Sequence, residues 1–273
     1  MSRRDFAGKV VLISGAASGL GAALCRRYAA AGAQIAALDV DASSLTTLVG
    51  ALREGGARAL ALPGDIADTA VCRAAVADAF AHFGGLDGLI NNAGISHRSL
   101  LQDTDPEVIR RVMEVNFFGA ANLTRAALPH IMARRGFIVA ISSVAGFAPL
   151  TGRTGYAASK HALHGFFESL GSEVEADGVG VTLVCPSFIR TGIGARATDG
   201  SGAPVSSPRI TPGGESSPEE IAARVFDAVA VGRALLLPDP IARKAWWLSR
   251  LAPGLYARIM KRRVGGEFRS APR

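Results

Sequence analysis

The chain has few cysteines, few aromatic side chains and no long apolar run. Its three cysteines, Cys25, Cys72 and Cys185, are odd in number and far apart, which excludes a disulfide framework and a metal site built from paired cysteines. The first apolar run, at residues 10–13, is too short for the core of a signal peptide or for a membrane span. We therefore expect a reduced, cytoplasmic setting and no bound metal.

An evenly spread positive charge is also missing, although the formal net charge is +7. Residues 241–273 hold nine lysines and arginines against one acid, Glu267, so the 21 basic and 22 acidic residues of 1–240 nearly balance. The basic character is thus a local feature of the C-terminal end. We expect no nucleic-acid partner.

Short aliphatic or β-branched runs alternate with alanine- and leucine-rich helical stretches along the chain. This alternation is typical of βαβ units on a parallel sheet, and it predicts an α/β fold with a doubly wound parallel sheet of about seven strands and helices on both faces. The expected helices include 20–31, 69–83, 106–134 and 156–177. The expected strands lie at 10–14, 34–39, 59–63, 88–91, 136–142, 180–185 and 234–238.

The sequence divides into one domain, 1–240, and a basic amphipathic C-terminal extension, 241–273. Within the domain, the segment 191–218 is rich in Gly, Ser, Thr and Pro, and we expect it to be a mobile loop over the substrate. The extension mixes Trp246, Trp247 and other apolar residues with basic ones over 243–263. Three roles stay open for it: contact with an anionic membrane surface, packing on a neighbouring subunit, or closure of the active site.

A glycine-rich turn, Ser14-Gly15-Ala16-Ala17-Ser18-Gly19-Leu20-Gly21, follows the first strand and precedes a helix. Such glycines let the backbone approach a pyrophosphate, whose charge the free amides of the helix start would meet. A turn without a ligand is the alternative. Asp39 ends the second strand, where its carboxylate would bind ribose hydroxyls and repel a 2'-phosphate, which favours NAD over NADP. Asp39 or Asp41 could instead form the turn.

Two further strand ends carry polar residues. Asp65, after the third strand, either caps a helix or contacts the adenine edge of a nucleotide. The fourth strand ends in Asn91-Asn92-Ala93-Gly94, where small residues would let the backbone run beside a cofactor. For Asn91 and Asn92 themselves, structural support between neighbouring strand ends is the favoured interpretation.

Tyr156 and Lys160 lie four residues apart in a helical pattern, so their side chains share one face. A free phenol has a pKa of about 10, and a nearby ammonium group lowers it toward the range useful for proton transfer. This spacing alone is more often a solvated helix face. Ser142 and Ser143, just past a strand, offer hydroxyls to a reacting oxygen. Asn116, inside an apolar helical stretch, needs a partner, and a local kink with a bound water would provide one.

These motifs in this order resemble the short-chain dehydrogenase/reductase superfamily over roughly residues 7–190. The resemblance implies a Rossmann-type fold and an NAD-dependent alcohol dehydrogenase or carbonyl reductase. It implies that Ser143, thirteen residues before Tyr156, is the catalytic serine instead of Ser142. It also implies that Asn116 holds the water of a proton relay through Lys160. The catalytic set is then Asn116, Ser143, Tyr156 and Lys160.

The resemblance also implies a cofactor-binding set. This set comprises Gly15, Ser18, Gly19, Leu20, Gly21, Asp39, Asp65, Ile66, Asn92, Ala93, Gly94, Tyr156, Lys160, Pro186, Ile189 and Thr191. The chain departs from the family pattern at two positions. Ser187 follows Pro186 where the family usually has glycine, which could alter the path of the next loop, and Ser14 replaces a common threonine.

The substrate residues are expected to be apolar, which favours a lipophilic steroid-, retinoid- or fatty-type alcohol or ketone. They are Phe147, Leu150, Phe188 and Ile193, beside Ser143 and Tyr156. We expect His97 and Arg153 to be exposed loop residues without a task, the alternative being contact with a polar group. By similarity to the superfamily, the helices 106–134 and 156–177 would pair subunits into a homodimer or homotetramer. A non-catalytic NAD(H)-binding regulator on the same fold is the alternative function.

Overall fold

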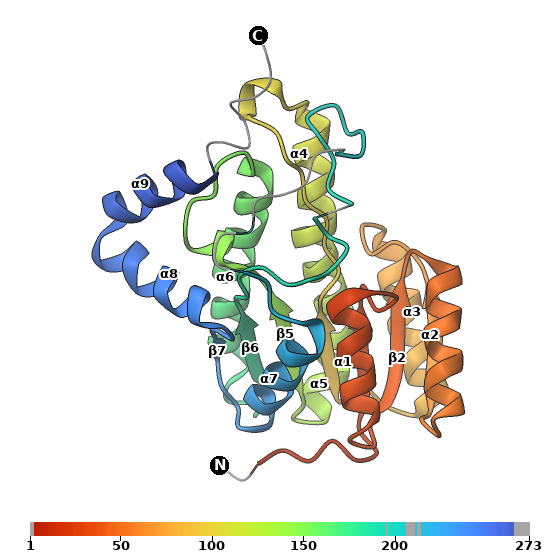
Figure 1. Cartoon of the computed structure of the whole chain (residues 1–273). Helices are drawn as coiled ribbons and strands as arrows, with labels where there is room; N and C mark the ends of the chain where they lie inside the picture. The colour runs from red at the N-terminus through yellow and green to blue at the C-terminus, as the bar shows by residue number, and fades with distance from the viewer. Residues whose placement is uncertain (1–2, 195, 206–210, 212–213, 265–273) are drawn as a thin grey trace.

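The computed structural model describes residues 3–194, 196–205, 211 and 214–264. They form a seven-stranded parallel sheet in the order β3-β2-β1-β4-β5-β6-β7 (Figure 1). The predicted doubly wound sheet is confirmed, and the order reverses between β1 and β4. The strands are β1 (Val10–Ser14), β2 (Gln34–Asp39), β3 (Ala59–Pro63), β4 (Gly88–Asn91), β5 (Phe137–Ile141), β6 (Gly180–Val184) and β7 (Leu235–Leu236).

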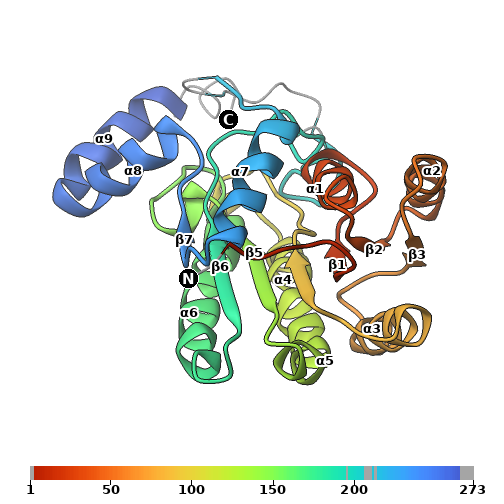
Figure 2. The ribbon, with the colours of Figure 1, turned by 90° about the horizontal axis from the view of Figure 1, so that it is seen from below.

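Helices cover both faces of the sheet (Figure 2). One face carries α1 (Gly19–Ala29), α2 (Ala42–Glu54) and α7 (Pro218–Ala230), and the other carries α3 (Thr69–Phe83), α5 (Ala120–Ala133) and α6 (Thr154–Val174). The short α4 (Pro106–Met113) packs against α6. Beyond the β7 edge follow α8 (Pro240–Leu251) and α9 (Pro253–Val264).

The central strands β1 and β4 have no polar side chain before their last residue, as expected for strands covered on both faces. In β1, Val11 and Ile13 join the core beneath α1 and α7, whereas Val10 and Leu12 join the core beneath α3 and α5. All five residues of β1 are buried. This packing holds the carboxyl ends of the strands in fixed positions, which matters for the residues that follow them.

The helix predicted over 106–134 is interrupted. Between α4 and α5 the backbone forms a π-helical turn, Glu114–Gly119, that contains the buried Asn116. The kink expected at Asn116 is thus present. Its cause is visible in the hydrogen bonds of the Asn116 amide to the backbone of Ile95 and to Ser159, which hold the side chain inside the protein.

The segment 191–218 is partly paired with other loops in its described portion. Thr198 forms backbone bridges with His97 and Pro204, and Ile189 forms one with Ser216. Residues 195, 206–210 and 212–213 of the expected loop lie outside the described residues. The expected mobility stays a prediction.

The C-terminal helices pack beside the loop that follows β5. Ala245 of α8 and Tyr256 of α9 are buried against Ala148 in a small separate core. Asp239 begins α8 by accepting a hydrogen bond from the amide of Ala242. Within the described ranges, no helix is long and apolar enough to cross a membrane.

Candidate active site

A cavity of about 500 Å³ lies at the carboxyl ends of the strands, where the strand order reverses between β1 and β4. This is the position at which doubly wound sheets bind ligands. Its lining includes every residue predicted to bind the cofactor except Gly21. The sheet topology therefore gathers residues from position 15 to position 191 around one space.

The glycine-rich turn is packed too tightly for side chains. A Cβ atom on Gly15, whose φ is +64°, would lie 2.7 Å from the Cα of Ala93. A Cβ atom on Gly21 would lie 1.9 Å from the carbonyl oxygen of Gly15, so Gly21 sets the packing of the turn from behind the cavity. At the start of α1, Ser18 makes no side-chain cap, so the first helix amides stay available to an anionic ligand. These features fit a dinucleotide pyrophosphate.

The two acids after β2 have different roles. Asp41 caps α2 by accepting a hydrogen bond from the amide of Ser44 at 3.0 Å. Asp39 faces the glycine turn, and its two oxygens accept hydrogen bonds from the amides of Ala17 at 2.9 Å and of Asp41 at 3.0 Å. Asp39 lines the cavity with negative charge at the place where a ribose would lie.

Asp65 does not cap the helix that follows it. The cap of α3 is Asp68, whose carboxylate accepts a hydrogen bond from the amide of Ala70. Asp65 instead accepts a hydrogen bond from the amide of Ala67. It also forms an ion pair with Arg111, with 2.5 Å between the carboxylate oxygen and the guanidinium nitrogen. Asp65 and Arg111 both line the cavity, so Asp65 belongs to its wall.

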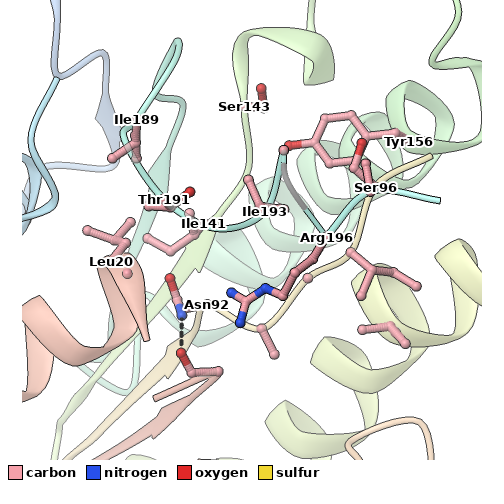
Figure 3. A pocket seen from close by; sticks show the side chains of 18 of the residues that line it. Leu20, Asn92, Ser96, Ile141, Ser143, Tyr156, Ile189, Thr191, Ile193 and Arg196 are labelled. Atoms are coloured by element: carbon pink, nitrogen blue, oxygen red, sulfur yellow. Dashed lines mark hydrogen bonds between the residues drawn. The ribbon is translucent and has the colours of Figure 1, made fainter. Parts of the chain in front are cut away.

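Asn92 ties the ends of β4 and β1 together, whereas Asn91 bonds to helix α5 and not to a neighbouring strand end. The Asn92 amide nitrogen donates to the carbonyl oxygens of Ser14 and Gly15, both at 2.9 Å, and one of these bonds is drawn in Figure 3. The Asn91 amide donates to the hydroxyl of Thr124 at 2.9 Å. The Ser14 hydroxyl accepts bonds from two successive backbone amides, beginning with Asn92. The serine hydroxyl therefore accepts these two bonds at a position where the family commonly has threonine.

Tyr156 lies in the first turn of α6, and Lys160 lies one turn later. The Lys160 ammonium is 5.7 Å from the centre of the Tyr156 ring and donates to the carbonyl oxygen of Ile141 at 2.8 Å. Burial lowers the pKa of Lys160 to about 8, an effect that the nearby Cys185 opposes. The ammonium is thus held in a buried position near the Tyr156 ring.

The two serines after β5 differ in what they face. The Ser142 hydroxyl is buried and donates to the backbone carbonyl of Lys160. Ser143 is half-buried, begins a short 3₁₀ turn (Val144–Gly146), and lies with Tyr156 on one side of the cavity (Figure 3). Of the two serines, Ser143 is the more exposed, and it lines the cavity on the same side as Tyr156.

The side chain of Asn116 links the loop after β4 to α6. Its amide nitrogen donates to the Ile95 carbonyl at 3.0 Å and to the Ser159 hydroxyl at 2.9 Å, while its oxygen accepts from the Ile95 amide at 2.8 Å. A Cβ atom built on Gly94 would lie 3.2 Å from that oxygen and 3.6 Å from the Lys160 ammonium. Asn116 and Lys160 therefore border the same small space.

Ser187, which replaces the usual family glycine, is accommodated without disturbing the strand end. Its amide donates to the carboxylate of Asp239 at 2.9 Å, and the same carboxylate caps α8. Pro186, Ile189 and Thr191 stay on the cavity wall. The backbone at residue 187 thus connects the loop after β6 to the C-terminal helices through a bond that a glycine could also make.

The predicted substrate residues divide into two groups. Leu150, Phe188 and Ile193 line the cavity. Phe147 does not, because its ring packs edge-on against Trp246 of α8, with 4.9 Å between ring centres. The C-terminal extension supplies an apolar partner that draws Phe147 away from the site.

The positions of several polar residues in or near the site were not predicted from the sequence. The expectation that His97 is exposed is wrong: the side chain is 0% exposed. Arg153 is half-buried and lines the cavity, as does the buried Arg98. The side chain of Arg196 extends into the cavity (Figure 3). Its guanidinium donates to the Ser18 hydroxyl at 2.9 Å. Residue 196 is far from residue 18 in the chain, so no local sequence pattern could predict this contact.

No metal site accompanies these residues. Among the residues that the structure describes, no group of three His, Cys, Asp or Glu side chains could hold a metal ion. The three cysteines are all free and buried.

Comparisons with known proteins find relatives that align with nearly the whole chain. The sequence is 38% identical over 269 residues to dehydrogenase/reductase SDR family member 7B of Bos taurus, with 96% of this chain and 83% of that protein covered. It is 39% identical to an SDR family protein 7-like of Anopheles gambiae, with 96% and 84% covered.

Solved structures give the same result. A short chain dehydrogenase/reductase from Burkholderia phymatum in complex with NAD superposes with a TM-score of 0.83 at 28% identity, covering 92% of this chain and 96% of that one. A short-chain dehydrogenase from Streptomyces avermitilis gives a TM-score of 0.79 at 28% identity, covering 93% and 96%. Residues 9–201 match the family model of the short chain dehydrogenases. The chain belongs to the short-chain dehydrogenase/reductase family of oxidoreductases.

Proposed function

We propose that the protein transfers a hydride between NAD(H) and a lipophilic secondary alcohol or ketone, using Asn116, Ser143, Tyr156 and Lys160. The observation that carries this proposal is the placement of Tyr156 and Ser143 together on one wall of a cavity whose other end is the glycine turn. The nicotinamide ring, when bound, supplies or accepts the hydride. The protein contributes position and electrostatics.

In this proposal Tyr156 exchanges the proton with the substrate oxygen. The buried ammonium of Lys160, 5.7 Å from the ring centre, stabilises the phenolate form of Tyr156. Ser143 donates a hydrogen bond to the oxygen that alternates between carbonyl and alkoxide. The Asn116 oxygen has one lone pair beyond its bond to Ile95, and it would accept from a relay water beside Lys160.

NAD is the proposed cofactor because Asp39 ends β2 and would repel a 2'-phosphate. The similar structure from Burkholderia phymatum was determined in complex with NAD. One observation points the other way: Arg196 brings a cation to Ser18, near the same end of the cavity. Direct comparison of NAD and NADP therefore belongs in the first experiment. The pyrophosphate would lie against Gly15, Gly19 and Leu20.

The proposed substrate is lipophilic because Leu150, Phe188 and Ile193 line the cavity near Tyr156. Steroid-, retinoid- and fatty-type alcohols and ketones are the candidate classes. Because Phe147 packs against Trp246 and does not line the cavity, the cavity wall has fewer apolar side chains than the sequence predicted.

The test is a screen by NADH fluorescence, run with NAD and NADP, over 2-alcohols and 2-ketones of increasing chain length together with ring ketones. The proposal expects turnover with NAD that rises with lipophilicity. Tight NADH binding without turnover of any compound would favour the alternative, a non-catalytic NAD(H)-binding regulator. Turnover restricted to NADP would overturn the cofactor assignment and leave the reaction class intact.

We also propose a peripheral contact between residues 243–263 and an anionic membrane surface. Trp247, Leu251 and Leu255 of α8 and α9 are 62%, 78% and 48% exposed. Basic residues lie among them, including Lys244 and Lys261, and apolar side chains beside cations are what interfacial helices present.

Co-sedimentation with vesicles of anionic or neutral phospholipid tests this contact. Replacing Trp247 and Leu251 by Ser should abolish binding to anionic vesicles, while Phe80→Ser, at an exposed apolar site on α3, should not. Absence of wild-type binding would reject the membrane role. A subunit interface or a cover for the active site would then remain for α8 and α9.

Self-association is the last proposal. Phe117, the 44%-exposed Phe118 and Phe166 form a chain of ring contacts with centres 5.0 and 5.9 Å apart beside α5 and α6. Such an apolar patch favours a homodimer or homotetramer formed through these helices. Light scattering on the wild type and on Phe118→Ser would measure it, and a monomeric wild type would reject it.

A further inference from the structure

The helix that carries Tyr156 has no cap of its own. Arg153, at the N-cap position of α6, makes no side-chain cap hydrogen bond, so the first amides of the helix need acceptors from elsewhere. The amide of Gly155, directly before Tyr156, donates to Nε2 of His97 at 2.9 Å. His97 comes from the loop after β4, 58 residues earlier in the chain.

The hydrogen bonds around His97 fix its protonation state. The Thr104 hydroxyl donates its one proton to the Leu100 carbonyl at 2.7 Å, so it accepts from Ser99, whose hydroxyl lies at 2.7 Å. The Ser99 hydroxyl therefore has no proton left for His97 and accepts from Nδ1, 3.2 Å away. His97 is neutral, with its proton on Nδ1 and its Nε2 lone pair directed at the helix.

The start of α6 packs closely against His97. A Cβ atom on Gly155 would lie 3.1 Å from His97 Nε2 and 3.3 Å from the side chain of Ile109 on α4. The backbone of His97 is also bridged to Thr198 of the segment after β6. His97 thus joins three parts of the cavity wall: the loop after β4, the segment after β6 and the start of α6.

We infer that His97 is a positioning residue, whose neutral imidazole caps α6 and holds the Tyr156 phenol in place for proton transfer. This inference rests on the proposed function. Loss of the acceptor would release the first turn of α6, and displacement of a reacting group by about 1 Å costs on the order of 100-fold in rate. None of the catalytic residues proposed above accounts for the burial of His97. Its cap on α6 gives this histidine a role in the reaction.

Protonation of His97 would break the cap. A protonated ring directs an N–H at the Gly155 N–H and places a positive charge at the positive end of the helix dipole. The residues that bond to the ring or the backbone of His97 are Ser99, Gly155 and Thr198, which carry no charge. Ile109 of α4, which lies beside Gly155, is also uncharged. Burial, and then the charge of Arg153, lower the pKa of His97 below its ordinary value of 6.5.

Two substitutions separate the cap from the shape of the side chain. His97→Gln places its amide oxygen near the position of Nε2 and keeps an acceptor, whereas His97→Leu keeps a similar size without one. His161→Leu is the matched control, because His161 is an exposed histidine on α6. The measurements are kcat with the best compound of the screen, Kd for NADH by fluorescence, and hydrogen exchange at residues 154–158.

We expect His97→Leu to lower kcat by about 10- to 100-fold, to leave Kd for NADH within twofold, and to speed exchange of the Gly155 amide. His97→Gln should recover most of kcat. It should also lose the decline in kcat at acidic pH that we expect in the wild type from protonation of His97, whose pKa lies below its ordinary value. His161→Leu should match the wild type.

Wild-type kcat and wild-type amide protection in His97→Leu would overturn the inference. If His97→Leu does not fold, the pH profile of His97→Gln decides, and an unchanged decline at low pH overturns the inference. Failure of the proposed function would look different, because Tyr156→Phe would then stay active or no compound would turn over. The exchange measurement tests the cap in either case.

Discussion

Replacement of Lys160 by methionine should make the folded protein no less stable, and up to about 2 kcal/mol more stable, at pH 7. Burial lowers the pKa of Lys160 from 10.5 to about 8, and at 1.36 kcal/mol per unit the charged side chain costs the fold about 3 kcal/mol. Methionine has a similar length and no charge. It leaves the Ile141 carbonyl without its donor, which costs about 1–3 kcal/mol.

The pH dependence of this effect has a definite sign. Between pH 8 and pH 10.5 the unfolded chain still holds the Lys160 proton that the folded chain has released, so wild-type stability rises with pH in this window. The stability of Lys160→Met relative to wild type should therefore fall by about 2 kcal/mol between pH 7 and pH 9.5.

Urea unfolding followed by tryptophan fluorescence at the two pH values measures this difference. Lys244→Met, at an exposed lysine of α8, is the control and should show no such change. If the stability difference between Lys160→Met and wild type is the same at pH 7 and pH 9.5, the conclusion that burial of the charged lysine destabilises the fold is refuted.

Two further predictions concern the cofactor end of the cavity. Asp39→Asn should weaken NAD binding and reduce the preference for NAD over NADP by about tenfold, because the variant lacks the carboxylate that would face a bound ribose. Kd values for both cofactors measure this, and an unchanged preference would place specificity at Arg196. Gly21→Ala should destabilise the protein by about 1–3 kcal/mol in urea and weaken NADH binding, because its Cβ would lie 1.9 Å from the Gly15 oxygen. Gly50→Ala, in α2 with no atom within 4 Å of the added Cβ, should instead stabilise by about 1 kcal/mol, and equal effects at both glycines would contradict the packing described for the turn.

The sheet could be predicted from the sequence because its signals are local. The run Val10–Ser14 is apolar on both faces and is followed by a glycine turn, which together indicate a buried parallel strand and a helix start. The pairing of Tyr156 with Lys160 follows from helix geometry alone. A local distortion at Asn116 was foreseeable because a polar side chain there needs a partner, although its π-helical form was not predicted.

The features that could not be predicted from the sequence depend on contacts between segments that are distant in the chain. His97 is buried because the segment around Thr198 and the start of α6 close over it, and neither is near it in the chain. Phe147 leaves the cavity because α8, about 100 residues later, places Trp246 against it. Such contacts require the three-dimensional arrangement, which local patterns do not contain.

The most direct test of the account is Tyr156→Phe, assayed with the best alcohol or ketone of the screen and by NADH fluorescence. The substitution removes one hydroxyl from the cavity wall and leaves the glycine turn, Asp39 and Lys160 in place. The account predicts that turnover falls by at least about 100-fold, the contribution typical of general acid-base catalysis, while Kd for NADH stays within twofold of wild type. Substantial turnover in Tyr156→Phe would contradict it.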